Sequence, residues 1–420
     1  MTIDFRLTSR QRALQLECRE FAADVLANAR ATQVLPTPEE RFCATKPVYE
    51  AMVAAGFLRK CIPASAGGDN AGLIDMAIMV EELYSVNASV TLTMLGTVLG
   101  LLPILLAGTP EQAARLLKPF LNNTGAPLAA FCSTEPGGSA NAAAPSPGKG
   151  VRTVADLAGD NWIINGRKKW VSSATGWDRK GADVLCVMCR TDVNAPPEKA
   201  MSVIVVERPA PGIVFERAID SVGHRAHLTP LFSFENVSTP RKNLLGAEGN
   251  GLALTAASFT GTAALVGILG VALMRAAFEF ALHFARTERR GGIQPIIEHQ
   301  AVGYALADAK IGIEAARYLS WRACHAVDTQ SPAADELAIQ AKIYGSESAV
   351  RVIVDLMRVV GIDSYDHEAP LGRLLQDALA LPIFDGGNMG VRRRQLHNLL
   401  KRPDYDALLA SATRESSGSC

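Results

Sequence analysis

Residues 162–173 read WIINGRKKWVSS, and they lie in a β-rich segment between two parts of the chain with a helical pattern. The apolar run Trp162-Ile163-Ile164 leads into Asn165-Gly166, a dipeptide typical of the tight turn between two antiparallel strands. Further β-rich runs, separated by Pro, Gly and Asn, follow at 184–189, 201–207 and 231–234. The segment is therefore predicted to form a small antiparallel β domain.

Helical patterns flank this segment on both sides. In the N-terminal part, apolar residues recur at helical spacing between Leu14 and Val25. Farther on, Thr109 is followed by Pro110 and Glu111, a combination typical of a helix start. After the β segment, stretches rich in Ala, Leu and Ile predict long helices at 252–286, 296–327 and 333–360.

The order helical, β, helical predicts an α+β chain of three domains. We expect an N-terminal helical domain in residues 1–125, a middle antiparallel β domain in residues 126–240 and a C-terminal domain in residues 241–420. In the last of these, three long helices and a shorter terminal one would make a four-helix bundle. A loop rich in Pro and Gly is expected at residues 142–150.

The composition is that of an ordinary globular protein, with 48% hydrophobic and 20% charged residues among 420. Lys plus Arg and Asp plus Glu are both 42, so no charge excess favours nucleic acid or an anionic membrane as a partner. The N-terminus lacks the apolar stretch of a signal peptide, and no apolar run of membrane-spanning length is free of Gly, Pro or polar residues. A cytoplasmic protein is expected.

Eight cysteines are scattered along the chain, which argues against a disulfide framework in so long a sequence. Cys186 and Cys189 form a CxxC motif inside an apolar run. A second CxxC and a suitably spaced His pair are missing, so packing in a core strand is favoured over zinc or redox chemistry. We expect no metal site.

The loop FCSTEPGGS, residues 131–139, is rich in hydroxyl groups and contains two glycines. Its backbone N–H groups and Ser or Thr hydroxyls could donate to carbonyl or phosphate oxygens of a ligand. A surface turn is an equally good interpretation of this loop alone. The candidate binding residues within it are Phe131, Cys132, Ser133, Thr134 and Ser139.

Trp170 and Ser172 follow the predicted hairpin. An indole can stack on a flat ring, and a hydroxyl two residues later would lie on the same face of a strand. Taken alone, a core Trp beside a satisfied Ser is the better interpretation of this pair.

A third candidate is Asp385 in the run FDGGN, residues 384–388. A carboxylate between apolar residues and two glycines can approach a bound ring closely, and Phe384, Gly386 and Gly387 would line that approach. Arg392 lies seven residues later, near the same face if a helix begins at Asp385. Two simpler interpretations are a helix cap and a local ion pair.

Together these segments resemble the acyl-CoA dehydrogenase superfamily over nearly the whole chain. FCSTEPGGS resembles its flavin loop, and INGRKKWVSS, residues 164–173, resembles the strand that covers the central flavin ring. RRGGIQPIIEHQ, residues 289–300, resembles the segment that reaches the FAD of a neighbouring subunit. FDGGN stands where the family has its catalytic Glu. The resemblance implies bound FAD and a homotetramer.

The chain departs from the superfamily pattern in three respects, and these departures indicate which branch of the superfamily it resembles. The base position holds Asp385, the Arg associated with the acyl-CoA site falls near Gly261, and the family's glycine-rich segment is replaced around Gly361. One branch, the nitroalkane oxidases, is similar in these respects. Its signature resembles IFDGGNMGVRRRQ here, and TAALVG, which begins at Thr262, is also close.

The resemblance implies a set of roles. Asp385 would be the base that takes the α-proton of a nitroalkane, Arg392 its partner, and Thr262 would stand where the branch has Ser. Ser172 would bond flavin N5, where the nitronate would add, with nitrite released and O2 reoxidising the flavin. The remaining implied FAD contacts are Phe131, Cys132, Ser133, Thr134, Ser139, Trp170, Arg290, His299, Gln300, Gly361, Phe384, Gly386 and Gly387.

Two alternatives stay open at this point. The same base could serve a dehydrogenase or oxidase of acyl thioesters, although the departures fit an ordinary CoA thioester poorly. The second alternative is a flavoprotein that has no catalytic activity and serves as an interaction scaffold. It predicts that neither nitroalkanes nor acyl thioesters reduce the flavin.

Overall fold

The computed structural model describes residues 6–144, 148 and 150–408, and these fall into two compact units. The first unit holds the residues up to Ala71 and Ile78–Phe259. The second holds Gly72–Ala77 and the residues from Thr260 onward. The first unit contains both the N-terminal helices and the strands, and the three-domain division stays a prediction.

Helices make up the N-terminal part of the chain, and three of them begin with a capping box. Thr8, Thr37 and Thr109 each accept a hydrogen bond from the third residue of the following helix, whose side chain bonds back to the cap. The predicted helix start at Thr109 is confirmed. These helices are α1 Ser9–Asp24, α2 Pro38–Ala44, α3 Lys46–Ala54, α4 Leu73–Val86, α5 Ala88–Ala107, α6 Pro110–Leu116 and α7 Lys118–Leu121.

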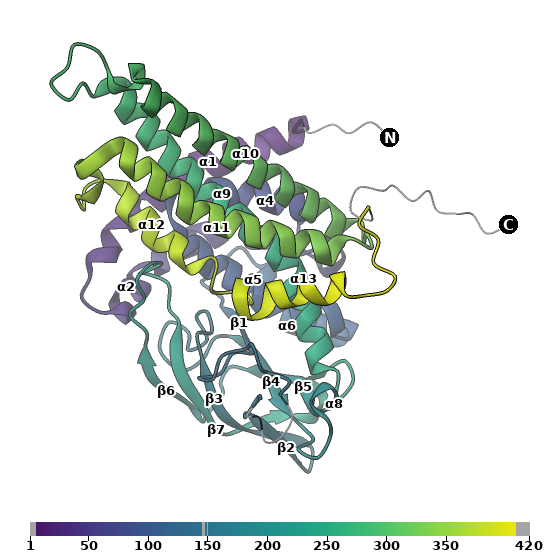
Figure 1. The fold of residues 1–420 in the computed structure, drawn as a ribbon. Helices are drawn as coiled ribbons and strands as arrows, with labels where there is room; N and C mark the ends of the chain where they lie inside the picture. The colour runs from purple at the N-terminus through teal and green to yellow at the C-terminus, as the bar shows by residue number, and fades with distance from the viewer. Residues whose placement is uncertain (1–5, 145–147, 149, 409–420) are drawn as a thin grey trace. The chain divides into compact units, whose positions relative to one another are not determined.

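The four predicted strands are β3, β4, β5 and β7 of one eight-stranded sheet, and the other four were not predicted. The strand order is β6-β7-β3-β2-β4-β5-β8, with β1 beside β4 (Figure 1). Most strand pairs are antiparallel, as predicted, but β1 and β2 both pair with β4 in the parallel sense, which the prediction missed. The connections from β1 to β4 and from β2 to β4 are long enough to return each chain in the same direction. The strands are β1 Ala129–Cys132, β2 Val154–Ala158, β3 Asn161–Lys169, β4 Val184–Arg190, β5 Met201–Glu207, β6 Ile213–Ala218, β7 Pro230–Pro240 and β8 Leu244–Leu245, with the short helix α8 Pro197–Ala200 before β5.

The hairpin predicted at Asn165-Gly166 was also wrong. Both residues lie inside β3, where the register against β7 shifts between Ile164 and Gly166. Gly166 has a φ of +150°, and a Cβ there would lie 2.6 Å from the Cα of Thr153. The dipeptide therefore makes a β-bulge and a close backbone approach. The turn that joins β2 to β3 falls at residues 159–160 instead.

Three long helices dominate the second unit and run side by side (Figure 1). They are α9 Gly251–Thr287, whose first residues belong to the first unit, α10 Gln300–Asp328 and α11 Ala334–Val360. Two shorter helices follow, α12 Pro370–Ala380 and α13 Arg393–Leu400. The predicted long helices are confirmed. Gly267 of α9 and Gly345 of α11 meet closely, since a Cβ on Gly345 would lie 2.7 Å from the Cα of Gly267.

Six of the seven cysteines in the described residues are buried, and Cys43 is exposed. Cys186 and Cys189 are fully buried in β4, as predicted, and burial raises the pKa of the Cys189 thiol to about 12. The seven cysteines in the described residues are free. Of the predicted loop at 142–150, residues 145–147 and 149 lie outside the described residues.

Two helices of the described chain, α5 and α9, are long and apolar enough to cross a membrane by length and composition alone. The glycines in both and Pro103 in α5 do not interrupt them, contrary to the expectation from the sequence. In each, 67% of the most apolar window is buried inside the protein, as in a core helix.

The contact between Gly267 and Gly345 generates a prediction. Gly345→Ala should lower the free energy of unfolding by about 1–3 kcal/mol, because the added methyl group forces α9 and α11 apart. Gly303→Ala in α10 is the matched control, since its Cβ would have no atom nearer than 4.0 Å. That change should be neutral or stabilising by up to about 1 kcal/mol. Thermal unfolding of both variants tests this, and equal melting temperatures would contradict it.

Candidate active site

The Asp385 carboxylate in the second unit is held at both oxygens. Its Oδ2 accepts a hydrogen bond from Arg392 Nη2 at 2.9 Å, and its Oδ1 accepts one from the Thr262 hydroxyl, also at 2.9 Å. The Asp385 side chain is 6% exposed and that of Arg392 is 4% exposed. The structure thus brings together the three residues predicted to be catalytic, from α9 and from the segment before α13.

A strained turn presents this carboxylate. Asp385 has a φ of +51° and Gly386 one of +68°, both in the left-handed region that Asp tolerates and Gly accepts freely. Arg392 Nε donates to the Asp385 carbonyl oxygen at 3.0 Å. A Cβ on Gly386 would lie 3.1 Å from that same Nε, so a side chain there would press on the guanidinium group.

The helix-cap interpretation of Asp385 was wrong. The residues from Asn388 to Arg392 form a π-helical turn, α13 begins only at Arg393, and the residue before the turn is Gly387. Asp385 and Arg392 therefore meet through a compact turn and not along a helix face. Of the simpler interpretations only the local ion pair survives, and this pair is buried.

The chemistry of this cluster follows from its charges. An Arg guanidinium is permanently charged, and an opposite charge in contact with a carboxylate favours the ionised form. An ionised carboxylate with free lone pairs can accept a proton from carbon when a C–H bond is brought within reach. The arrangement therefore suits a general base.

The first unit carries the loop that resembles a flavin-binding segment. Phe131 and Cys132 end β1 as buried residues, and the Phe131 ring stacks on Phe259 at a centroid distance of 5.8 Å. Ser133 is buried and Thr134 is half-buried, while Ser139 is exposed. Burial raises the pKa of the Cys132 thiol to about 12, so the thiol stays neutral.

Glu135, which the sequence reasoning passed over, anchors this loop. Its carboxylate accepts hydrogen bonds from the backbone N–H groups of Arg152 and Thr153 and from Lys168 Nζ, at 2.8, 2.9 and 3.0 Å. Burial alone would raise the pKa of Glu135, but the Lys168 charge and these bonds hold it below its usual value. Lys168 is fully buried, so the pair ties the loop to β3.

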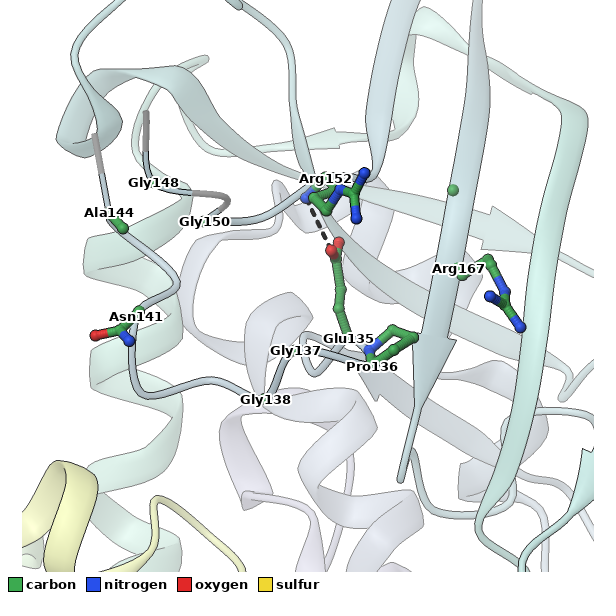
Figure 2. Close-up of a pocket in the computed structure, with 11 residues that line it drawn as sticks. Glu135, Pro136, Gly137, Gly138, Asn141, Ala144, Gly148, Gly150, Arg152 and Arg167 are labelled. Atoms are coloured by element: carbon green, nitrogen blue, oxygen red, sulfur yellow. Dashed lines mark hydrogen bonds between the residues drawn. The ribbon is translucent and has the colours of Figure 1, made fainter. Parts of the chain in front are cut away.

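A cavity of about 650 Å³ lies along this loop (Figure 2). In that view the Glu135 carboxylate points toward the Arg152 backbone, and the glycines bring the chain past it. Glycine backbone and two Arg side chains can accommodate an anionic or strongly polar group. The lining residues are Glu135, Pro136, Gly137, Gly138, Asn141, Ala144, Gly148, Gly150, Arg152, Gly166 and Arg167.

Trp170 and Ser172 lie just beyond β3, not on its face. Trp170 has a φ of +65°, which ends the strand, and its backbone N–H bonds to the Pro230 carbonyl oxygen at 3.2 Å. The expected shared strand face was therefore wrong. The core interpretation of Trp170 was wrong too, because its side chain is 49% exposed and available for stacking.

Ser172 belongs to a buried hydrogen-bond chain that the sequence did not reveal. Its hydroxyl lies 3.1 Å from His227 Nε2, and the Thr93 hydroxyl of α5 lies 3.0 Å from His227 Nδ1. Burial, helped by His224, lowers the pKa of His227 to about 3, so its imidazole is neutral. A neutral imidazole has one donor and one acceptor nitrogen, so His227 accepts from one hydroxyl and donates to the other.

The groups around Ser172 fit a flavin ring. Ser173, Thr175 and Thr229 each have a buried hydroxyl oxygen that finds no protein partner in the described part of the chain. Orphaned buried hydroxyls are expected where a polar ligand atom or an ordered water completes the bonding. The exposed indole of Trp170 offers a surface on which a flat ring can stack. Half-buried Ser172 and the three buried hydroxyl groups offer polar contacts.

Seven predicted cofactor contacts lie in the second unit: Phe384, Gly386 and Gly387 lie within two residues of Asp385 in the sequence, and the other four are Arg290, His299, Gln300 and Gly361. Arg290 donates to the Val360 carbonyl oxygen, forms an ion pair with Asp363 at 2.8 Å and approaches Gly361. Arg290 and Gly361 are thus adjacent. His299 and Gln300 are exposed at the start of α10. Their contact with an FAD of another subunit stays a prediction.

Family comparison matches three consecutive parts of the chain. Residues 8–124 match the acyl-CoA dehydrogenase N-terminal domain, residues 130–237 the middle domain and residues 249–400 the C-terminal domain. The chain belongs to the acyl-CoA dehydrogenase family. No group of three or more His, Cys, Asp or Glu placed to hold a metal ion occurs among the described residues.

Within that family the chain is similar to nitroalkane oxidases. It is 43% identical to the nitroalkane oxidase of Podospora anserina, over 97% of this chain and 98% of the relative. It is 36% identical to the nitroalkane oxidase of Fusarium oxysporum, over 97% of both chains.

Solved structures give the same grouping. The Podospora anserina enzyme superposes with a TM-score of 0.93 at 42% identity, covering 98% of this chain and all of that one. A second structure is of a flavoprotein nitroalkane oxidase that was studied for the roles of an Arg and an Asp in its reaction. It has a TM-score of 0.95 at 34% identity, and the match covers 97% of this chain and 99% of that one. Two structures of nitroalkane oxidase active-site variants also match, one with Asp changed to Asn and crystallized with 1-nitrooctane, the other with Ser changed to Ala and crystallized with 1-nitrohexane. Each has a TM-score of 0.94 and 35% sequence identity, and the match covers 99% of this chain and 100% of the other.

The buried, neutral His227 generates a prediction about pH. Its folded-state pKa of about 3 lies below the ordinary 6.5, so the unfolded chain binds a proton between these values and the folded chain does not. The stability of the unmodified protein should therefore fall as pH falls through this window, by up to about 1.4 kcal/mol per pH unit from this group.

The His227→Gln variant should lack this contribution. Its stability, measured by denaturant unfolding at several pH values, should fall less steeply from pH 6.5 downward. His299→Gln, at an exposed position, is the control and should keep the slope of the unmodified protein. Identical slopes for all three proteins would show that His227 is not the buried titrating group.

Proposed function

We propose that this chain is an FAD-dependent oxidase that converts nitroalkanes to aldehydes or ketones, releasing nitrite and hydrogen peroxide. The observation that carries the proposal is the Asp385 carboxylate, buried and fixed between the Arg392 guanidinium and the Thr262 hydroxyl. The similarity to nitroalkane oxidases over nearly the whole chain supports the substrate class. One solved relative was studied for an Asp and an Arg in its reaction, and this chain pairs the same two residue types.

Asp385 would take the proton from the carbon next to the nitro group. The C–H bond breaks toward Asp385, and its electron pair is delocalised onto the nitro oxygens, so the proton ends on the carboxylate and the charge on the substrate. Arg392 places a permanent positive charge against the Asp385 carboxylate before this step. Thr262 orients the carboxylate by holding Oδ1, and an added methyl group distinguishes it from the Ser expected in the branch.

The flavin, when bound, would accept the electrons of the oxidation. In the first unit, the chain's part is to hold it: the loop after β1 through backbone and hydroxyl donors, and Trp170 by stacking. The neutral His227 keeps the Ser172 hydroxyl in one orientation without adding a charge beside the ring. Dioxygen as the final electron acceptor, a homotetramer and a cytoplasmic location complete the proposal.

An acyl thioester as substrate is the less favoured alternative. The position near which the family's acyl-CoA Arg falls is Gly261, inside α9, where no side chain is available to bind CoA. The chain therefore retains the proton-abstracting part of the family's site and lacks this substrate-binding part.

Anaerobic mixing of the FAD-loaded protein with nitroethane tests the proposal directly. Loss of the oxidised flavin absorbance, with nitrite released in proportion, is the expected result. Nitroethane should bleach the flavin, whereas a short acyl-CoA should not. A protein bleached by acyl-CoA with no nitrite from nitroethane would overturn the proposal, and so would one bleached by neither.

Asp385→Asn should separate the proton transfer from the rest of the reaction. Removing the base should lower kcat/KM for neutral nitroethane by roughly 10²–10⁴-fold, the share that general-base catalysis commonly supplies. The preformed nitronate has already lost its proton, so its oxidation should change little. Steady-state nitrite release from both substrate forms measures this, and equal losses on the two would rule out Asp385 as the base.

A further inference from the structure

A second cation lies buried beside the Asp385 and Arg392 pair. Lys342 of α11 has no exposed surface, and its Nζ donates to Asn388 Oδ1 at 2.6 Å. Among the described residues no carboxylate forms an ion pair with this ammonium group. Desolvation by burial lowers the pKa of Lys342 to about 8, with Asp385 acting in the opposite direction.

Packing and stability do not explain a lysine at this position. Burying an ammonium group that has no paired carboxylate is unfavourable, and an apolar side chain of similar shape would fill the same space at lower cost. Most other buried positions of α11 are either apolar, such as Ala338, Ala341 and Ala349, or carry a small uncharged hydroxyl group, as at Ser346 and Ser348. A charge that weakens the fold in this way is expected where it serves the reaction.

Asn388 links this lysine to the base. Its Oδ1 accepts from Lys342, and its Nδ2 donates to Ser346 Oγ at 3.1 Å and to Glu347 Oε1 at 3.0 Å. The backbone N–H of Asn388 bonds to the Pro382 carbonyl oxygen at 2.8 Å, which closes the turn that contains Asp385. Because an ammonium group can only donate, Lys342 fixes which way the Asn388 amide faces.

The same residue also changes the charge balance at the base. The charged groups that act on Lys342 are Asp385, Arg392, Glu347 and Arg393. They are already paired, Arg392 with Asp385 at 2.9 Å and Arg393 with Glu347 at 2.6 and 2.9 Å. These four charges cancel, so protonated Lys342 leaves the cluster with one net positive charge, on the buried side where Asp385 and Arg392 also lie.

We propose that Lys342 is a positioning residue for the reaction: its ammonium group holds the turn that carries Asp385 through Asn388 and supplies the positive charge that favours anionic groups there. Both the ionised base and the negative charge that develops on the substrate during proton removal gain from this field. The inference rests on the proposed function, since it assigns Lys342 to the step that Asp385 performs.

Three substitutions separate the two parts of the role. Lys342→Met removes the charge and the hydrogen bond and keeps a similar shape. Lys342→Gln keeps a donor without the charge, and Lys342→Arg keeps the charge. Lys310→Met, an exposed lysine of α10 that pairs with Glu314, is the matched control for loss of a lysine.

The FAD-loaded variants are compared on neutral nitroethane and on its preformed nitronate, together with their melting temperatures. Lys342→Met should lose roughly 10–100-fold in kcat/KM on neutral nitroethane, the size of one nearby charge at an effective dielectric constant of about 20. The loss on nitronate should be less than about threefold. Nitroethane deuterated at carbon 1 should show an undiminished isotope effect, because proton removal becomes more limiting. Lys342→Arg should recover most of the rate, and Lys310→Met should lose none.

Several results would overturn the inference. Equal losses on both substrates with a lowered melting temperature would mean that Lys342 acts only on the fold. An unchanged rate of Lys342→Met on neutral nitroethane would remove Lys342 from the step. Recovery by Lys342→Gln and not by Lys342→Arg would refute the contribution of charge. Should Lys342→Met fail to fold, the Gln and Arg variants carry the same comparison.

The unmodified enzyme distinguishes this inference from the function on which it rests. If it oxidises neither nitroethane nor nitronate, the proposed function is wrong. If it oxidises both and the Lys342 variants behave like the Lys310→Met control, only the inference is wrong.

Discussion

The buried ion pair between Asp385 and Arg392 is the constraint on which the rest of this site depends. A carboxylate with 6% of its side chain exposed is stable as an anion only if a cation meets it, and Arg392 does so at 2.9 Å. The carboxylate of Asp385 and the guanidinium group of Arg392 meet within one short segment. This requires a tight backbone path, with Asp385 and Gly386 in the left-handed region and a π-helical turn that ends at Arg392. Gly386 is needed because the guanidinium group lies against its Cα.

Buried polar and charged side chains have different roles in the two compact units. In the second unit, the buried Asp385 carboxylate is paired with Arg392, and Lys342 adds a buried cation held by Asn388. In the first, the buried Glu135 and Lys168 pair fixes a loop, and His227 is kept neutral so that it orients hydroxyl groups without adding charge. Charge is thus concentrated where a proton is to be removed. Around Ser172 the polar groups are uncharged, as befits contact with a ring whose own electrons change during the reaction.

Several features could be predicted from sequence because they depend on local pattern. Helix starts such as Thr109, the three long helices and four of the eight strands follow from capping residues, periodicity and β-propensity. The failures came where a partner distant in sequence decides the conformation. Asn165-Gly166 has the composition of a turn, yet pairing with β7 and contact with Thr153 make it a bulge. Trp170 is a large apolar residue, yet the left-handed backbone at the strand end leaves it exposed.

The sequence by itself determined the order of the elements, the residue types of the base cluster and, through resemblance, the family. Spacing in the chain could not decide whether Asp385 caps a helix or pairs with Arg392, because both outcomes fit a separation of seven residues until the turn is folded. Only the tertiary structure joined Thr262 to Asp385, His227 to Ser172 and Lys342 to Asn388, which are 123, 55 and 46 residues apart. Contacts over such separations depend on how helices and strands pack, and a single sequence carries no local pattern that records them.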